Sequence, residues 1–154
     1  MKTCLICRKY NGKIYSIDEN VYPYPPVHPN CRCVINNLCA LLAGTATDRG
    51  VNGADWYLKH IGNLPDYYIP IAKAHHLGWV ASKGNLSTVA RNKMIFGGIF
   101  NNKENKLPQK IGRIWYEADI NYIGGYRNND RILFSNDGLI FVTYDHYETF
   151  AEIE

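Results

Sequence analysis

The last 115 residues of this 154-residue chain contain no cysteine. A domain without cysteine cannot depend on disulfide bonds, so residues 40–154 are compatible with an oxidising or a reducing compartment. Long apolar runs are missing as well, and the longest, residues 38–43, is far too short to span a bilayer. The first eight residues lack the apolar stretch of a signal peptide, so we expect any export to depend on something other than this N-terminus.

Repeats and low-complexity segments are also missing, and the net charge is only +3. This balance excludes a protein that binds nucleic acid through its overall charge alone. Residues 1–44 carry five Lys or Arg against two Asp or Glu, whereas residues 45–154 carry twelve of each. If the second segment acts on a nucleic acid, it must use a local cluster of positive charge.

Apolar residues make up 46% of the chain and charged residues 20%, which are values of a globular protein. The length suits one ordinary domain with a small appendage. The chain also contains twelve tyrosines, a residue that favours strands and can stack on nucleic-acid bases. We interpret most of these tyrosines as packing residues.

All five cysteines lie within the first 39 residues. A C-x2-C pair is followed after twenty-three residues by a C-x-C pair, with a histidine three positions before the second pair. Two paired clusters of nitrogen and sulfur ligands are typical of a tetrahedral zinc site, although free or disulfide-bonded cysteines are the alternative. We predict a structural zinc with four ligands and one substitute: Cys4, Cys7, His28 and Cys31, with Cys33 able to replace His28.

This cassette resembles the C-terminal end of phage Mu-type minor head proteins, which carry a C-x-x-C followed by an H-P-N-C-R-C run such as residues 28–33. The small, polar segment Gly44–Gly50 then reads as a junction. The sequence therefore predicts two parts: a zinc-knuckle-like appendage with a linker over residues 1–44, and a second domain over residues 45–154.

Periodicity in the second part predicts helices first and strands afterwards. Apolar residues have helical spacing over 51–61, Pro70 is placed in a first helical turn before 71–77, and Asn85 is a candidate N-cap for 86–90. Strands are expected at 94–100, 114–120, 130–135, 139–143 and about 148–152, with a hairpin turn at 136–138. The predicted fold is α+β, with N-terminal helices packed on an antiparallel sheet.

Charged side chains occupy these short strands where apolar residues would be usual. Alternation places Trp115, Glu117 and Asp119 on one face of the 114–120 strand. Arg131 opens the next strand, and His146 follows the one after that. Singly, each charge is better explained as a strand-edge, ion-pair or turn residue, but together they suggest a site for phosphate chemistry without a metal.

From about residue 52 to residue 153 the sequence resembles the barnase-like, guanyl-specific bacterial ribonucleases, in one register without a gap. The matching blocks include 77–86, 117–122, 130–133 and 145–147. The resemblance implies the microbial ribonuclease fold and an RNA endonuclease that needs no cofactor for catalysis.

The resemblance also implies a role for each matched polar residue. Glu117 would be the general base for the ribose 2′-hydroxyl, and His146 the general acid for the leaving 5′-oxygen. Arg127 and Arg131 would hold the phosphate, and Tyr147 would pack beside the acid and the bound base. Because the nucleophile is the 2′-hydroxyl, the product would be a 2′,3′-cyclic phosphate, and DNA would not be cleaved.

The family recognises guanine with a loop that matches Phe100, Asn101, Asn102, Lys103 and Glu104. Backbone N–H groups of this loop would meet the guanine O6, and the Glu104 carboxylate would accept from its N1 and N2 donors. Asn101 and Lys103 replace the serine and arginine usual in the family, so a looser guanine preference is expected. The alternative is a plain polar turn.

Two further positions depart from the family. Ile71 stands where the family has a catalytically helpful lysine, and Gly98 stands where it has an aspartate before the recognition loop. The resemblance implies that these charges form a pair, so their joint loss predicts a slower enzyme with the same mechanism. Lys73 is a candidate for the missing cation.

A phage-head-like cassette joined to a ribonuclease domain has the layout of a polymorphic toxin. We therefore expect a secreted or delivered effector that acts on single-stranded RNA in a target-cell cytoplasm, with no membrane or DNA partner. A barstar-like or dedicated immunity protein is its expected partner. The alternatives are a secreted nutritional ribonuclease and a non-catalytic, zinc-dependent assembly module.

Overall fold

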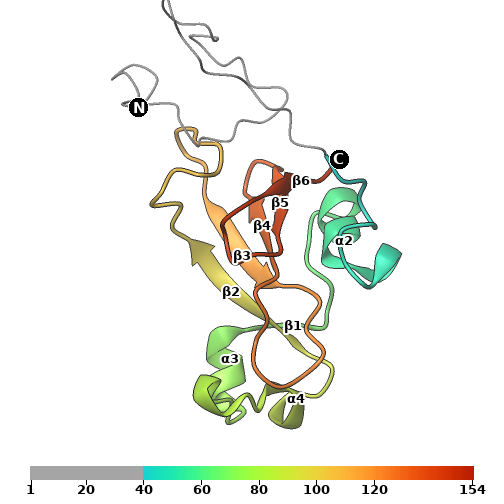
Figure 1. Cartoon of the computed structure of the whole chain (residues 1–154), viewed down its shortest axis with the longest axis vertical. Coiled ribbons are helices and arrows are strands. Elements are labelled where there is room, and N and C mark those ends of the chain that lie inside the picture. Colours follow the sequence, from blue (N-terminus) through green and yellow to red (C-terminus); the bar gives the residue numbers. More distant parts are fainter. Residues whose placement is uncertain (1–39) are drawn as a thin grey trace, which may run out of the picture. The chain divides into compact units, whose positions relative to one another are not determined.

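The computed structural model describes residues 40–154 (Figure 1). Of the described residues, 40–101 and Arg113–Glu154 form the larger compact unit, whereas Asn102–Gly112 belongs to a second unit. The predicted zinc ligands Cys4, Cys7, His28, Cys31 and Cys33 lie outside the described residues. The zinc site and the division at residue 44 therefore stay predictions.

A six-stranded sheet forms the centre of the larger unit, with its strands in sequence order. The strands are β1 (Tyr68–Pro70), β2 (Met94–Phe100), β3 (Trp115–Asp119), β4 (Arg131–Ser135), β5 (Ile140–Thr143) and β6 (Ala151–Glu152). Beyond β6, Leu41 forms a bridge with Ile153, so the segment that opens the described chain lies beside its C-terminus.

Most of the sheet is antiparallel, as the sequence predicted, but β1 pairs with β2 in parallel. A parallel pair needs a long crossover, and residues 71–93 supply it. The strand β1 escaped prediction because it has only three residues and ends at Pro70. Pro70 is therefore the last strand residue and the N-cap of the following helix, rather than a residue of the first helical turn.

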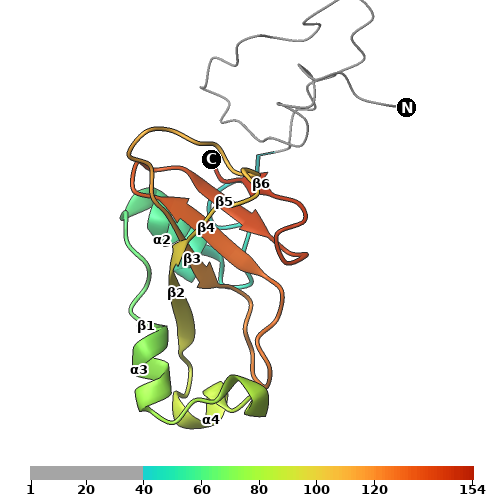
Figure 2. The same ribbon diagram turned by 90° about the vertical axis from the view of Figure 1, so that its left-hand side faces the viewer.

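Within residues 40–154, three short α-helices and two 3-10 helices precede or interrupt the strands. They are η1 (Gly50–Asn52), α2 (Ala54–His60), α3 (Ile71–His76), η2 (Ala81–Lys83) and α4 (Leu86–Val89). The helix expected over 51–61 is divided because Gly53 is extended and caps α2. In Figures 1 and 2, α3 and α4 gather beside β1, away from α2.

Two apolar clusters hold these elements together. In one, Ala54 and Leu58 of α2 pack with residues of β3, β4 and β5, including Ala118, Ile132 and Val142. Full burial of a Val, Leu or Ile side chain contributes about 1.5–3 kcal/mol. Because side chains alternate along β3, Glu117 and Asp119 lie on the face opposite to Ala118 and α2.

The second cluster joins α3 and α4 to the start of β2. It includes Ala74, Trp79, Leu86 and Ile95, all buried. The hairpin predicted at 136–138 connects β4 to β5, and Gly138 adopts the positive φ of 97° that such a turn requires.

Candidate active site

Glu117 lies in the middle of β3, half-buried, on the sheet face away from α2. Its Cα partners are Leu133 on β4 and Gly98 on β2. The register between β2 and β3 shifts between Phe96 and Gly98, which makes Gly97 the extra residue of a β-bulge.

Gly97 provides the space that the Glu117 side chain occupies. A Cβ atom at position 97 would lie 2.7 Å from Glu117 Oε1 and 2.9 Å from its Cγ. A glycine in a strand next to a second glycine is a recognisable signal of a bulge or a close approach, but the sequence reading assigned Gly97 no role. The bulge therefore fixes where the carboxylate can lie.

Tyr147 reaches the same carboxylate from the loop between β5 and β6. Its hydroxyl donates a hydrogen bond to Glu117 Oε2 at 2.6 Å. Its ring stacks on Phe100, with 5.2 Å between centroids and 23° between planes. Burial, together with the hydrogen bond to the Glu117 carboxylate and its charge, raises the pKa of Tyr147 well above the ordinary value, so the hydroxyl stays a donor.

His146 precedes Tyr147 and is exposed to solvent. Its ring centroid lies 4.8 Å from that of Tyr147. Both residues have left-handed backbones, with φ of 58° for His146 and 73° for Tyr147. Two consecutive residues other than glycine in this region are strained, and such strain concentrates at functional sites.

Asp145 holds this strained loop in place. Its carboxylate accepts hydrogen bonds from the Thr143 hydroxyl, from the Thr149 hydroxyl and from the backbone N–H groups of Glu148 and Thr149. The bonds from Thr149 are the main reason that the pKa of Asp145 falls to about 2. The position of Asp145 in a matched block was noted from the sequence, but its bracing function was not.

Asp119 is the buried partner of Arg127, two residues along β3 from Glu117. It is fully buried and accepts from Arg127 Nε at 2.8 Å and from Arg127 Nη2 at 2.6 Å. Burial alone would lower the pKa of Arg127, but the hydrogen bond and charge of Asp119, together with the charge of Glu117, raise it. Nη1 of Arg127 is left without a hydrogen bond within residues 40–154.

Arg131 approaches the same carboxylate from β4, directly across from Asp119. Its side chain is 5% exposed, and its Nη1 donates to the backbone oxygens of Asn128 and Asp130. Its Nε lies 3.2 Å from Asp119 Oδ1, but the alignment is too poor for a hydrogen bond. One carboxylate therefore neutralises two guanidinium groups, a role of Asp119 that the sequence reading missed.

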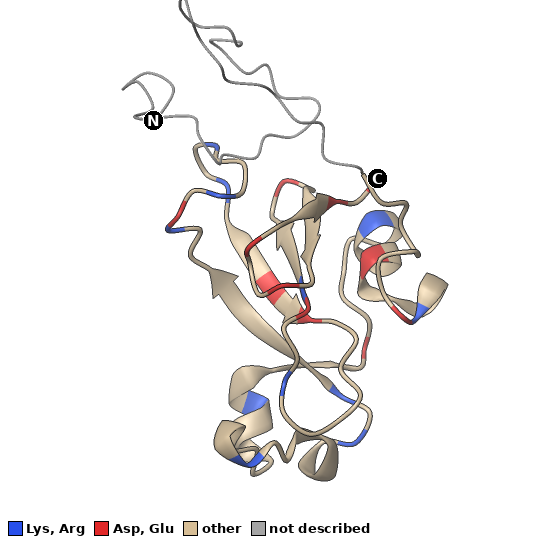
Figure 3. Ribbon diagram, in the orientation of Figure 1, with Lys and Arg blue, Asp and Glu red and all other residues tan. Residues whose placement is uncertain are grey.

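The structure thus brings together Glu117, Tyr147 and Phe100, joins Arg127 to Arg131 through Asp119, and places His146 beside Tyr147. Figure 3 shows the acidic positions of β3 among strands that carry few other charges. The geometry joins a carboxylate, an imidazole and two cations on one face of the sheet. Such a group of side chains can move protons and hold an anion.

The predicted recognition loop is divided between the two units. Asn101 is exposed at the end of β2. Within the second unit, Asn102 braces the loop, because its amide donates to the Leu107 oxygen at 2.7 Å and its side-chain oxygen accepts from the Leu107 N–H at 3.1 Å. Lys103 is exposed, and Glu104 forms an ion pair with Lys106 at 3.2 Å.

Ile71 and Gly98, where the sequence departs from the family it resembles, lie on different elements. Ile71 begins α3 and is 37% exposed. Gly98 has a φ of 92° and lies opposite Glu117 in the strand register. The left-handed backbone favours glycine here. Lys73, the candidate substitute, is exposed on α3.

No group of three or more His, Cys, Asp or Glu within residues 40–154 is arranged to hold a metal ion. Within the same residues, every helix is too short or too polar to cross a bilayer.

Comparison with known proteins shows the family of the chain. A family model described as ribonuclease matches residues 53–154. Over 102 residues the chain is 54% identical to a protein named Ribonuclease from Heyndrickxia coagulans, across 66% of this chain and 94% of that one. Proteins named Ribonuclease from Bacillus intermedius and Bacillus pumilus are each 53% identical over 102 residues, which is 66% of this chain and 63% of theirs. The chain belongs to the ribonuclease family.

Proposed function

We propose that residues 53–154 form an endoribonuclease that cleaves single-stranded RNA without a metal ion and leaves a 2′,3′-cyclic phosphate. The observation that carries this proposal is the placement of Glu117 on one sheet face with Arg127 and Arg131, both tied to the buried Asp119. A base beside two fixed cations suits a phosphodiester better than a neutral substrate.

Glu117 acts as the general base in this mechanism. Oε2 accepts the Tyr147 hydroxyl, whereas Oε1 accepts no hydrogen bond within residues 40–154 and lies against the space left by Gly97. Oε1 is therefore the oxygen that takes the proton of the ribose 2′-hydroxyl. The 2′-oxygen then attacks phosphorus, and the bond from phosphorus to the 5′-oxygen breaks.

His146 supplies the proton that the departing 5′-oxygen requires. Its ring is exposed and lies against Tyr147, whose hydroxyl donates a hydrogen bond to Glu117, the general base. Acid and base thus approach the phosphate from two neighbouring elements, the loop after β5 and the strand β3. The products are a 2′,3′-cyclic phosphate and a 5′-hydroxyl.

Arg127 and Arg131 stabilise the negative charge that develops on the phosphoryl oxygens. Asp119 occupies Nε and Nη2 of Arg127, while backbone oxygens occupy Nη1 of Arg131. Nε of Arg131 faces Asp119, so the terminal groups left for the phosphate are Nη1 of Arg127 and Nη2 of Arg131. Donors held in place before the reaction cost no reorganisation at the transition state.

The preference for guanine is part of the same proposal. Phe100, the last residue of β2, stacks on Tyr147. Glu104 gives up its ion pair with Lys106 and accepts hydrogen bonds from the guanine N1 and N2 donors. The hydrogen bond from the Asn102 amide to the Leu107 oxygen keeps the backbone N–H groups of the loop in position. Asn101 and Lys103 make this preference looser than strict.

We further propose that the ribonuclease domain is the effector of a toxin, delivered to act in the cytoplasm of a target cell. Support comes from the resemblance of residues 1–36 to phage head proteins. An acidic immunity protein, barstar-like or dedicated, is the matching partner. The alternative is a ribonuclease secreted for nutrition. A co-encoded inhibitor that protects the producing cell would support the toxin function.

The test is cleavage of a fluorescent single-stranded RNA by the full chain, with and without EDTA. We expect equal cleavage in both conditions and a 2′,3′-cyclic phosphate terminus on the product. Glu117→Gln and His146→Gln should each reduce the rate by about 10²–10⁴-fold. Lys59→Gln, an exposed change on α2, is the matched control and should leave the rate unchanged. Full activity in either site variant, or dependence on a metal, contradicts the proposal.

A further inference from the structure

Acidic and basic residues are unevenly distributed along residues 45–154, although the segment contains equal numbers of each. Residues 67–101, which run from β1 to the end of β2, contain four basic residues and no Asp or Glu: Lys73, Lys83, Arg91 and Lys93. In Figure 3 the ribbon around α3 and α4 accordingly carries blue and no red. One end of the larger unit is therefore cationic. It provides the local cluster of positive charge that this nearly neutral chain needs in order to act on a nucleic acid.

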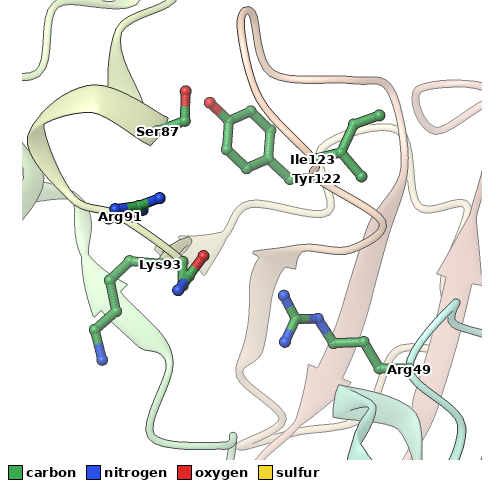
Figure 4. A pocket seen from close by; sticks show the side chains of 7 residues that line it. Arg49, Ser87, Arg91, Lys93, Tyr122 and Ile123 are labelled. Carbon is green, nitrogen blue, oxygen red and sulfur yellow. The ribbon is translucent and has the colours of Figure 1, made fainter.

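A pocket of about 380 Å³ opens at this end. Its lining comes from three separate parts of the chain: Arg49 before η1, Ser87 of α4 with the turn Arg91–Lys93, and Tyr122 and Ile123 after β3. Figure 4 shows the guanidinium groups of Arg49 and Arg91 on different sides of the opening. This volume is typical of a small-molecule site. It can hold a nucleotide unit and is larger than an inorganic ion needs.

The two arginines of this pocket are available for an anion. Within residues 40–154 neither Arg49 nor Arg91 forms an ion pair with a carboxylate. Arg49 is held in position by Tyr67, whose ring centroid lies 4.3 Å from the guanidinium carbon. Lys93 differs, because its amine donates to the Asp66 backbone oxygen and points away from the opening in Figure 4.

One loop connects this pocket with the proposed phosphate site. The loop leaves β3 at Ile120, lines the pocket with Tyr122 and Ile123, and then supplies Arg127, which Asp119 holds. The Tyr122 hydroxyl donates to the Gly125 oxygen at 2.9 Å and so fixes the curve of the loop between the two places. A strand of RNA that follows this loop meets positive charge at both ends of it.

We propose that the pocket lined by Arg49, Ser87, Arg91 and Tyr122 binds a nucleotide of the single-stranded RNA substrate outside the cleaved step. Arg49 and Arg91 hold the phosphodiester of that nucleotide, Ser87 donates to it, and the exposed Ile123 contacts its sugar or base. This inference rests on the proposed ribonuclease function. A positively charged groove that follows the backbone is a usual way to hold a single strand without reading its sequence.

The experiment compares kcat/KM on a guanosine-containing dinucleotide with kcat/KM on oligonucleotides extended at the 5′ or the 3′ end. The variants are Arg49→Gln, Arg91→Gln and the double change. Lys83→Gln is the matched control, because it removes one charge from the same cationic end without lining the pocket. Thermal melting of each variant verifies that the fold is retained.

We expect the wild-type rate to rise when the substrate is extended at one end. Each arginine change should lower kcat/KM on that extended substrate by about tenfold, and the dinucleotide rate should stay unchanged. In the double variant, the slope of log affinity against log salt concentration should become less steep by about 0.7 for each phosphate contact that is lost. Lys83→Gln should affect both substrates alike and weakly.

Equal losses in Lys83→Gln and in the arginine variants overturn the proposal, because they would show a diffuse field rather than a pocket. Normal cleavage of every substrate by the arginine variants also overturns the proposal. This holds even if the variants bind an acidic protein less tightly, because the pocket would then serve a protein partner and not RNA. Binding of an all-deoxy oligonucleotide, measured by fluorescence anisotropy, tests the pocket independently of catalysis. If the wild type binds this probe through Arg49 and Arg91 but cleaves no dinucleotide, the proposed function fails while the pocket stands.

Discussion

Replacing Asp119 with asparagine tests whether one buried carboxylate positions both arginines. The change keeps the shape of the side chain but removes its charge and places an amide N–H₂ where guanidinium donors point. Arg127 loses at least one of its two hydrogen bonds, at 2.8 and 2.6 Å, and Arg131 loses the negative charge 3.2 Å from its Nε. The two cations then repel each other without a common counter-ion.

The magnitude follows from burial. Removing one partner of a buried ion pair costs about 3–5 kcal/mol, and a hydrogen bond to a charged group contributes about 1.5–3 kcal/mol. Asp119 is fully buried but the Arg127 side chain is 25% exposed, so water recovers part of the loss. We expect the free energy of unfolding to fall by about 3 kcal/mol, which corresponds to a fall in Tm of roughly 15 °C for a domain of this size.

The assay is urea denaturation of Asp119→Asn together with kcat/KM for RNA, which should fall by about 10²-fold because the phosphate donors lose their positions. Asp137→Asn is the matched control. Asp137 forms a comparable pair with Arg113 at 2.9 Å, but it lies in the exposed hairpin turn after β4. Because the Arg113 side chain is only 5% exposed, the loss of this pair should also lower stability, but it should leave activity intact. An Asp119→Asn protein with wild-type stability and activity refutes the reasoning.

Three further changes probe the surroundings of the base. Gly97→Ala should keep the fold but reduce kcat by about 10²-fold, because the new Cβ would lie 2.7 Å from Glu117 Oε1 and displace it; an unchanged kcat contradicts this. Tyr147→Phe should lower kcat by about tenfold with little change in KM, since the hydroxyl at 2.6 Å orients the carboxylate; a change in KM alone would point to substrate packing instead. Asp145→Asn should lower Tm at neutral pH. The pKa of Asp145 is about 2 in the folded protein and about 4 when unfolded, so the difference from wild type should shrink as pH falls from 4 to 2; a difference independent of pH would exclude the carboxylate as its source.

Much of the sheet followed from local patterns. The strand at 94–100 has the predicted bounds, and alternation along 114–120 correctly placed Glu117 and Asp119 on one face. The antiparallel register then sets Asp119 opposite Arg131, which no spacing along the chain reveals. Sequence patterns thus found the charges, while their pairing depended on contacts between strands.

Other features could not be read from local patterns. The strand β1 is too short to have a detectable period, and its parallel pairing depends on the crossover through α3 and α4. The left-handed backbones of His146 and Tyr147 are held by Asp145, through contacts that the residue types alone do not specify. The pocket brings together Arg49, Ser87 and Tyr122, which are 38 and 35 residues apart along the chain. Each of these features is a product of tertiary packing rather than of propensity.

The central claim is that Glu117 and His146 act as base and acid on the ribose 2′-hydroxyl and the leaving oxygen. The most direct measurement is the pH dependence of kcat/KM on a dinucleotide for the wild type, Glu117→Gln and His146→Gln. A bell-shaped wild-type profile is expected, because the base must be deprotonated and the acid protonated. Glu117→Gln should lose the rise on the acidic side, and His146→Gln the fall on the basic side. If both variants keep the full bell, other groups move the protons and the account is wrong.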